Sequence, residues 1–176
     1  MKNNYYFLFD MDGTVLFTDK LNNESYNYAL KKYNFPIIQT QKRITRKLIK
    51  KCYSYLEDKE LTNIIQLKQN YFINNIKKAD RNEPLFSILQ SLEKNKCILW
   101  TSADKKRAKA MIMEFNLSLF FSKKIISEKK YISEDIKNIC AELSCKDSQL
   151  LVFENDPIIV NKLKKINVSC FLFIHH

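Results

Sequence analysis

The sequence predicts an α/β fold: a Rossmann-like parallel sheet of about five strands with helices on both faces, and a small all-helical domain inserted after the first strand. Two observations support this fold class. Short runs rich in β-branched and aromatic residues alternate along the chain with segments whose apolar residues recur at helical spacing. Between the first two runs, however, residues 21–82 show only helical periodicity and are too many for one crossover connection.

The predicted strands are the short apolar runs, and each strand-helix-strand unit should cross over with a right hand. These strands are Tyr5–Phe9, Cys97–Trp100, Lys124–Ile126, Gln149–Phe153 and Val168–Ile174. The helices between the later strands are predicted from three apolar sets: Ala108, Ile112 and Phe115; Ile136, Ile139 and Leu143; Ile159, Leu163 and Ile166.

The inserted domain is expected to span residues 21–82, which leaves residues 1–20 and 83–176 for the sheet domain. Three helices are expected in the insertion, around Tyr26–Tyr33, Ile44–Leu56 and Ile64–Ile76. Pro84 stands where a proline in the first helical turn would restart the sheet domain.

The composition is that of a folded protein and argues against several other classes. The apolar runs are far shorter than the roughly 20 residues that a membrane-spanning helix needs, and the N-terminal segment does not resemble a signal peptide, so a cytoplasmic location is expected. The 5 cysteines include no Cys-x-x-Cys pair and are expected to be reduced. The histidines are confined to positions 175 and 176, which disfavours a zinc site.

The net charge of +11 makes nucleic acid or an anionic membrane conceivable as a partner. Lysine is abundant all along the chain, however, and this favours a generally charged surface over a dedicated polyanion site. The most basic segment, Lys42–Lys51, reads as an amphipathic helix with a solvated face, with RNA binding as the alternative.

The single glycine of the chain, Gly13, lies in the segment Asp10-Met11-Asp12-Gly13-Thr14. Glycine adopts a positive φ at little cost, so a sharp turn is expected directly after the first strand. In open α/β sheets, ligands bind at this end of the strands.

Two carboxylates separated by one residue, Asp10 and Asp12, can divide the work of a nucleophile and a proton donor. They repel each other unless a cation lies between them, and Mg²⁺ favours a few carboxylate oxygens together with water and phosphate. Taken alone, the segment could equally be an acidic β-turn.

The segment from Asp10 to Thr14 after an apolar strand resembles the first motif of the haloacid dehalogenase (HAD) superfamily, and the other motifs follow in order. Thr101-Ser102, at the end of the second strand, is similar to the second motif, and the resemblance implies that the Thr101 hydroxyl binds the transferring phosphoryl group. The resemblance also implies a lysine before the helix that precedes the fourth strand. Lys130 is assigned to it, with Lys129 as the alternative.

The fourth motif of the family is matched by Glu154-Asn155-Asp156, after the fourth strand. The family commonly has two adjacent acidic residues here, whereas this chain has Asn155 at the second position. An amide oxygen still coordinates a hard cation but adds no negative charge, so weaker metal binding is expected. Glu154 or Asp156 could support the metal, although Asp156-Pro157 also reads as the N-cap and first turn of a helix.

The resemblance implies a Mg²⁺-dependent phosphatase with a C1-type helical cap, acting on a small phosphorylated metabolite. It gives Asp10 the role of nucleophile, Asp12 that of general acid and base, and Thr101 and Lys130 that of phosphoryl ligands. Gly13, Thr14 and Ser102 are expected to contact the substrate, and Asp10, Asp12 and Asn155 the metal. Asp12 argues against dehalogenation, because the dehalogenases of the family do not need a proton donor there.

Three alternatives remain at the level of the sequence. A sugar-phosphate mutase would use the same residues. A nucleic-acid end phosphatase or RNA-binding protein would use the basic segment Lys42–Lys51. A catalytically weakened HAD-like binding protein would be explained by Asn155.

Overall fold

The computed structural model describes residues 5–173, so Ile174 of the last predicted strand and both histidines lie outside the described part. The chain divides into two compact units. One comprises the residues up to Leu16 together with those from Arg81 onward, and the other comprises Phe17–Asp80. The expected boundaries at 20/21 and 82/83 fall within a few residues of this division.

Within the described residues, the first unit is built on a five-stranded sheet in the order β5-β4-β1-β6-β7, and all of its strand pairs are parallel. The strands are β1 Tyr6–Phe9, β4 Cys97–Thr101, β5 Lys123–Ile126, β6 Leu150–Glu154 and β7 Ser169–Leu172. The chain builds outward from β1 to β5 and then returns to the other side of β1. The C-terminal end of β1 is therefore the point where the strand order reverses, and ligands bind there in open α/β sheets.

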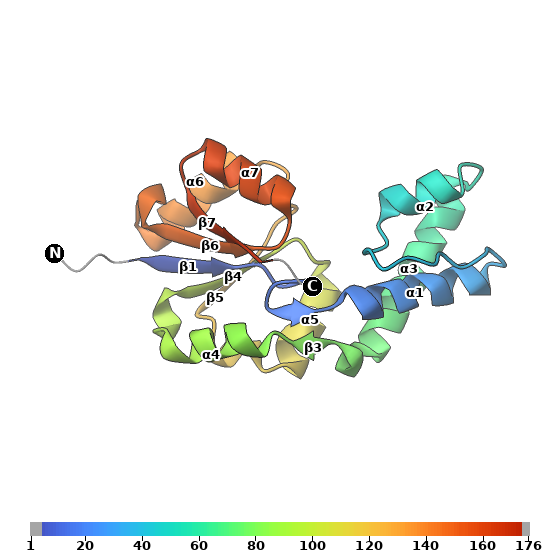
Figure 1. Ribbon diagram of the computed structural model, residues 1–176, viewed down its shortest axis with the longest axis horizontal. Helices are drawn as coiled ribbons and strands as arrows, with labels where there is room; N and C mark the ends of the chain where they lie inside the picture. The colour runs from blue at the N-terminus through green and yellow to red at the C-terminus, as the bar shows by residue number, and fades with distance from the viewer. Residues whose placement is uncertain (1–4, 174–176) are drawn as a thin grey trace. The chain divides into compact units, whose positions relative to one another are not determined.

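Helices cover both faces of this sheet, α6 and α7 on one side and α4 and α5 on the other (Figure 1). They are α4 Glu83–Ser91, α5 Lys105–Glu114, α6 Ile132–Leu143 and α7 Pro157–Lys165, with short 3₁₀ turns at Lys94–Lys96, Leu117–Leu119 and Asp147–Gln149. Asn82 caps α4 by accepting a hydrogen bond from Leu85 N, with Pro84 in the first turn. The predicted restart of the sheet domain at Pro84 is confirmed.

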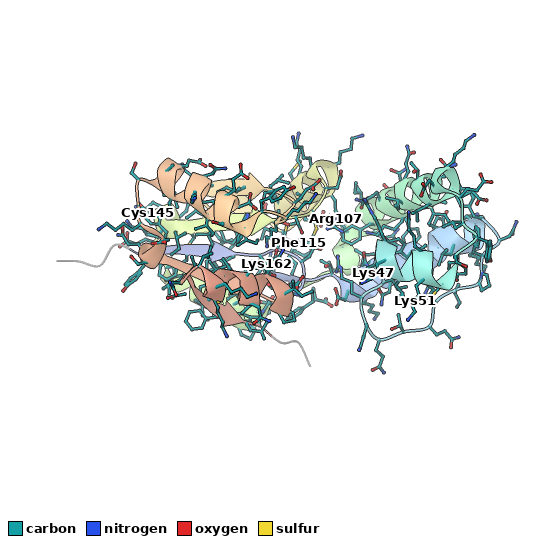
Figure 2. The ribbon with its side chains drawn as sticks, turned by 90° about the horizontal axis from the view of Figure 1, so that it is seen from above. Lys47, Lys51, Arg107, Phe115, Cys145 and Lys162 are labelled. Atoms are coloured by element: carbon teal, nitrogen blue, oxygen red, sulfur yellow. The ribbon has the colours of Figure 1, made fainter. Side chains whose placement is uncertain are left out.

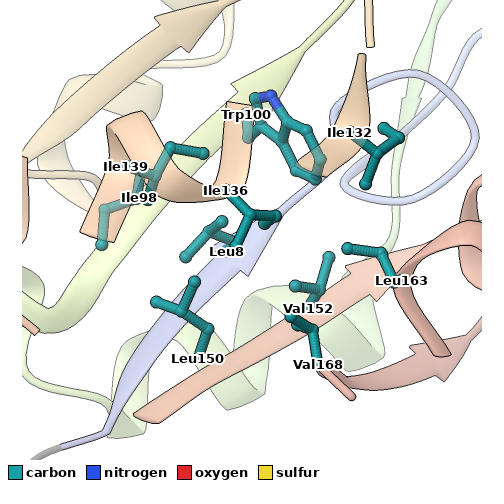
Figure 3. Close-up of a cluster of buried hydrophobic side chains, with 10 residues drawn as sticks. All are labelled: Leu8, Ile98, Trp100, Ile132, Ile136, Ile139, Leu150, Val152, Leu163 and Val168. Atoms are coloured by element: carbon teal, nitrogen blue, oxygen red, sulfur yellow. The ribbon is translucent and has the colours of Figure 1, made fainter. Parts of the chain in front are cut away.

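Side chains alternate between the two faces of each strand. Leu8, Ile98 and Val152 point to the face covered by α6 and α7, where they pack with Ile132, Ile136 and Leu163 (Figure 3). Parallel strands with buried faces of this kind carry continuous apolar runs, which is why these strands were recognisable in the sequence.

The second unit is helical, with α1 Asp19–Lys32, α2 Arg46–Cys52, α3 Asp58–Asn74 and a 3₁₀ turn at Ile76–Lys78. Helix α1 packs along α3. Asparagine side chains of α1 form hydrogen bonds with the connection from α1 to α2. Asn22 donates to the carbonyl of Ile44, and Asn27 both donates to and accepts from the main chain of Ile38. These bonds satisfy loop backbone groups that a helical pattern cannot reveal.

The five predicted strands are confirmed to within a residue or two at each described end. A separate two-stranded sheet of β2 Leu16–Phe17 and β3 Asp80–Arg81 was not predicted, because two-residue strands carry no periodicity. Among the described residues, none of the helices is both long and apolar enough to cross a membrane.

Candidate functional site

The site is built where β1 and its two neighbours end. Asp10 follows β1 directly, and its N–H donates to the carbonyl of Phe153 in β6 at 2.9 Å. The register pairs Phe9 with Leu99 on one side and with Phe153 on the other. The next residues along these three adjacent strands are Asp10, Trp100 and Glu154. Because side chains alternate between the two faces of a strand, they lie on the same face as Leu8, Ile98 and Val152.

The segment after Asp10 forms a tight loop held by its own backbone. Gly13 N donates to Leu16 O at 2.7 Å, and Leu16 N donates to Met11 O at 2.9 Å. Gly13 has φ +85°, and a Cβ at this position would lie 2.2 Å from Nδ2 of Asn155. The glycine is therefore required both by backbone conformation and by the close approach of the loop after β6.

Lys129 occupies the centre of the site. Its Nζ donates to Asp10 Oδ1 at 2.5 Å and to Glu154 Oε2 at 2.7 Å, and all three side chains are buried. Lys130 is exposed, and its Nζ lies over the Tyr131 ring at 5.3 Å from the centroid. The assignment of the site lysine to Lys130 is thus corrected to Lys129. The reason is local: Lys129 has φ 53°, a left-handed conformation that sets its side-chain direction apart from that of its neighbour.

The buried charges shift one another's titration. Burial is the largest influence on Asp10 and raises its pKa; Lys129 opposes this shift and Glu154 adds to it. Burial acts to lower the pKa of Lys129, but the carboxylates of Asp10 and Glu154 outweigh it and the pKa is raised. Lys129 is therefore held as an ammonium ion shared between two carboxylates.

Asp12 points to a different cation. Its Oδ2 accepts a hydrogen bond from Nη2 of Arg107 at 2.8 Å, and both side chains are largely buried. Arg107 projects from α5, whose N-terminal end is capped by Asp104 through the N–H groups of Lys106 and Arg107 (Figure 2). The two aspartates of the first motif thus have different cationic partners: Asp10 contacts Lys129, and Asp12 contacts Arg107.

The side chain of Asn155 meets the main chain of the Asp10 loop. One terminal atom of its amide lies 3.2 Å from the main-chain oxygen of Asp12 and 3.2 Å from Oε1 of Glu154. With nitrogen in that place, the amide donates to both oxygens. This amide therefore joins the loop after β6 to the loop after β1.

The oxygen donors available at this end of the sheet are of the types that Mg²⁺ prefers. Within residues 5–173, no three side chains of His, Cys, Asp and Glu gather as a metal site. A cation here would instead be held by the Asp10 carboxylate, the main-chain oxygen of Asp12 and the Asn155 amide oxygen. Such a mixed set of one carboxylate and neutral oxygens suits Mg²⁺, which keeps several waters and uses few carboxylates.

The remaining acidic residues of the fourth motif have structural partners. Glu154 Oε1 accepts from the N–H groups of Asn155 and Asp156, both at 3.0 Å, while Oε2 binds Lys129. Asp156 is exposed and caps α7 by accepting from Ile158 N at 2.8 Å. The prediction that Asp156-Pro157 starts a helix is confirmed. Glu154 orients the loop and Lys129.

The hydroxyl residues predicted for the site have different surroundings. Thr101 ends β4, is buried, and its Oγ1 accepts from Ala103 N at 3.1 Å, which leaves its own proton for an acceptor. Ser102 is exposed. Thr14 is fully buried, and within the described residues its hydroxyl has no hydrogen-bond partner, while its carbonyl accepts from Asn82 Nδ2.

Arg107 and Trp100 were not predicted as site residues. Arg107 is a charged residue on the buried face that α5 forms with Ala108 and Met111, and a charge on a buried face normally has a partner. The sequence therefore indicated that Arg107 has a partner, but it did not show that this partner is Asp12. Trp100 was indistinguishable from an ordinary core residue of a strand.

Gly13→Ala is expected to lower the free energy of unfolding by about 2 kcal/mol or more, because alanine is strained at this φ and its Cβ meets Asn155. Urea denaturation of Gly13→Ala, Asn155→Ala and the double variant separates the two causes. Since Asn155→Ala removes the colliding atoms, the glycine substitution should cost less in that background. Equal costs in both backgrounds would show that the collision contributes nothing.

Comparisons with known proteins identify the family of this chain. Residues 7–172 match the family model described as haloacid dehalogenase-like hydrolase. No match is found among curated proteins.

Several solved structures share the fold. A candidate phosphatase from Clostridium difficile superposes with a TM-score of 0.76 at 21% identity, covering 97% of this chain and 85% of that one. A predicted phosphoglycolate phosphatase from Haemophilus somnus gives 0.79 at 15% identity with the same coverage. A protein from Thermotoga maritima described as a candidate beta-phosphoglucomutase gives 0.74 at 18% identity, covering 98% and 86%. With the family model matching nearly the whole chain, this protein belongs to the haloacid dehalogenase-like hydrolases.

Proposed function

We propose that this protein is a Mg²⁺-dependent phosphatase that hydrolyses a small phosphorylated metabolite through an aspartyl phosphate on Asp10. The observation that carries the proposal is the buried carboxylate of Asp10 at the end of β1, which accepts a hydrogen bond from Lys129. A carboxylate in this position, beside a fixed cation, is arranged to attack phosphorus.

In the first step, an oxygen of Asp10 forms a bond to phosphorus as the bond from phosphorus to the leaving oxygen breaks. Lys129 holds Oδ1 of Asp10, so Oδ2 is the oxygen assigned to the attack. Asp12 gives its proton to the leaving oxygen, and the alcohol departs. Lys129 and the Thr101 hydroxyl offset the charge that spreads over the phosphoryl oxygens.

In the second step, water attacks the phosphorus of the aspartyl phosphate while Asp12 takes the proton. The bond between phosphorus and Asp10 breaks, phosphate leaves, and both aspartates return to their starting states. Arg107, at 2.8 Å from Asp12 Oδ2, stabilises the carboxylate form that serves as the base.

Charge balance also favours a divalent cation at this site. Asp10, Asp12 and Glu154 are three acidic groups facing two basic groups, Lys129 and Arg107. A phosphate ester adds further negative charge in a buried place, which is costly without compensation. When bound by Asp10, the Asp12 carbonyl and Asn155, Mg²⁺ would supply the missing positive charge beside the phosphoryl oxygens.

The class of substrate is proposed from the fold neighbours and from the cap. The Haemophilus and Thermotoga proteins carry names that refer to small phosphorylated metabolites. The helical unit is basic, with 13 Lys and Arg against 6 Asp and Glu between residues 17 and 80. A net positive charge on this helical unit attracts anionic substrates.

Specific observations support two alternative functions. The Thermotoga protein is described as a mutase candidate, and a mutase would use the same aspartates to return the phosphoryl group to a sugar phosphate. Lys47 and Lys51 on α2 are exposed (Figure 2), which suits an oligonucleotide with a terminal phosphate. A screen of sugar phosphates, phosphoglycolate, nucleotides and 5′-phosphorylated oligonucleotides at fixed Mg²⁺ discriminates among these substrates.

Replacement of the nucleophile tests the phosphatase activity itself. With p-nitrophenyl phosphate, the wild-type protein is expected to release phosphate in the presence of Mg²⁺ and to lose that activity with EDTA. Asp10→Asn should be inactive, because an amide cannot attack phosphorus. Wild-type turnover that does not exceed the Asp10→Asn background would refute the phosphatase proposal and favour a non-catalytic binding protein.

The two adjacent lysines provide a matched pair of variants. Lys129→Met is expected to lower kcat at least about 100-fold, since it removes the cation beside Asp10, whereas Lys130→Met should stay within about twofold of the wild type. Because Lys129→Met leaves two buried carboxylates without their cation, Lys129→Met/Glu154→Gln serves as a second variant of lower net charge. Equal losses in Lys129→Met and Lys130→Met would contradict the assignment.

Asn155→Asp tests the metal ligand set. A second carboxylate oxygen in place of the amide should strengthen Mg²⁺ binding, seen as about a tenfold lower Mg²⁺ concentration for half-maximal activity. Asp156→Asn, which changes the charge of the exposed helix cap, is the control and should leave that concentration unchanged. If Asn155→Asp needs the same Mg²⁺ concentration for half-maximal activity as the wild type, Asn155 is not a metal ligand.

A further inference from the structure

The Trp100 side chain lies directly beneath the site lysine. Trp100 is the single tryptophan of the chain and is completely buried in β4. The Lys129 Nζ lies 4.7 Å from the centre of its ring. Strand alternation explains the contact, because the register of β4 on β1 puts Trp100 beside Asp10 on the same face of the sheet.

The indole ring is held on its far side by a chain of hydrogen bonds. Its Nε1 donates to Ser127 Oγ at 2.9 Å, and Ser127 Oγ donates to Asp135 Oδ2 at 2.9 Å in the first turn of α6. Ser127 is itself fixed by its N–H, which donates to Thr101 O at 3.0 Å. Figure 3 shows the ring beside Ile132 and Ile136 of α6, so packing and hydrogen bonds restrain the same side chain.

Lys129 needs such restraint. Its ammonium group must lie between Asp10 and Glu154, yet it is carried on a flexible four-carbon stem from a loop residue with a positive φ. The two carboxylates contact the ammonium group through hydrogen bonds, and the ring of Trp100 is a third contact of the same group. An aromatic face attracts an ammonium ion through its quadrupole, and the attraction is greatest where water is excluded, as it is here.

We propose that Trp100 is a positioning residue of the phosphatase site. Its ring, which is hydrogen-bonded through Ser127 to Asp135, keeps the Lys129 ammonium group within hydrogen-bond distance of Asp10. The inference rests on the proposed function for its kinetic consequence only. The contact between the ring and Lys129 can be tested without any turnover. Trp100 is assigned no contact with substrate or metal and acts through Lys129.

Two substitutions separate the aromatic face from the volume of the side chain. Trp100→Phe keeps a ring and should retain kcat within about threefold, whereas Trp100→Leu removes it and should lower kcat about tenfold or more with little change in KM. Ser127→Ala, which frees the indole but leaves it in place, is expected to fall between them. Equal kcat for folded Trp100→Leu and Trp100→Phe would overturn the proposal.

Fluorescence provides the second measurement and does not depend on activity. Because Trp100 is the single tryptophan, all indole emission reports its surroundings. Lys129→Met removes a charge 4.7 Å from the ring and should shift the emission maximum or intensity, whereas Lys130→Met should leave the spectrum unchanged. Identical spectra for the wild type and a folded Lys129→Met variant would refute the contact, even if the protein has no phosphatase activity.

Discussion

Lys129 joins three parts of the sheet domain through a single ammonium group. It comes from the loop after β5, and its two partners stand at the ends of β1 and β6. Each of the two carboxylates is buried, and a buried charge is tolerated only when it is paired and hydrogen-bonded. The other arrangements at this end of the sheet, including the loop of the first motif and the turn after β6, are organised around this interaction.

The topology of the sheet places this interaction at the edge where open α/β sheets bind ligands. Since β1 is central and the strand order reverses beside it, the loops after β4 and β6 diverge from the end of β1. Asp10 therefore lies at the carboxyl edge of the sheet, next to Trp100 on one side and Glu154 on the other. In the proposed reaction, a phosphoryl group bound there would meet acidic, basic and hydroxyl groups from four segments that are distant in sequence.

Two residues at the same place, Gly13 and Lys129, have a positive φ, as do Asn34, Asn116, Ser144 and Asn167 elsewhere in the described chain. Gly13 has a positive φ where a side chain would collide with Asn155, and Lys129 has a positive φ without being glycine. Each departure from ordinary conformation costs stability and persists because its surroundings fix it. In this protein the surroundings are the buried ion pairs, the hydrogen bonds of Glu154 to the turn after β6, and the packed ring of Trp100.

The sequence by itself determined the five strands, the inserted helical segment, the helix starts at Pro84 and Pro157, and the loop around Gly13. Each of these follows from local chemistry: side-chain periodicity, the fixed φ of proline, and the freedom of glycine. The tertiary structure decided which of two adjacent lysines enters the site, that Asp12 pairs with Arg107, and that Trp100 lies under Lys129. Those outcomes depend on the φ angle of Lys129 and on the packing of elements that are distant in sequence. Such contacts leave no periodic pattern in the sequence.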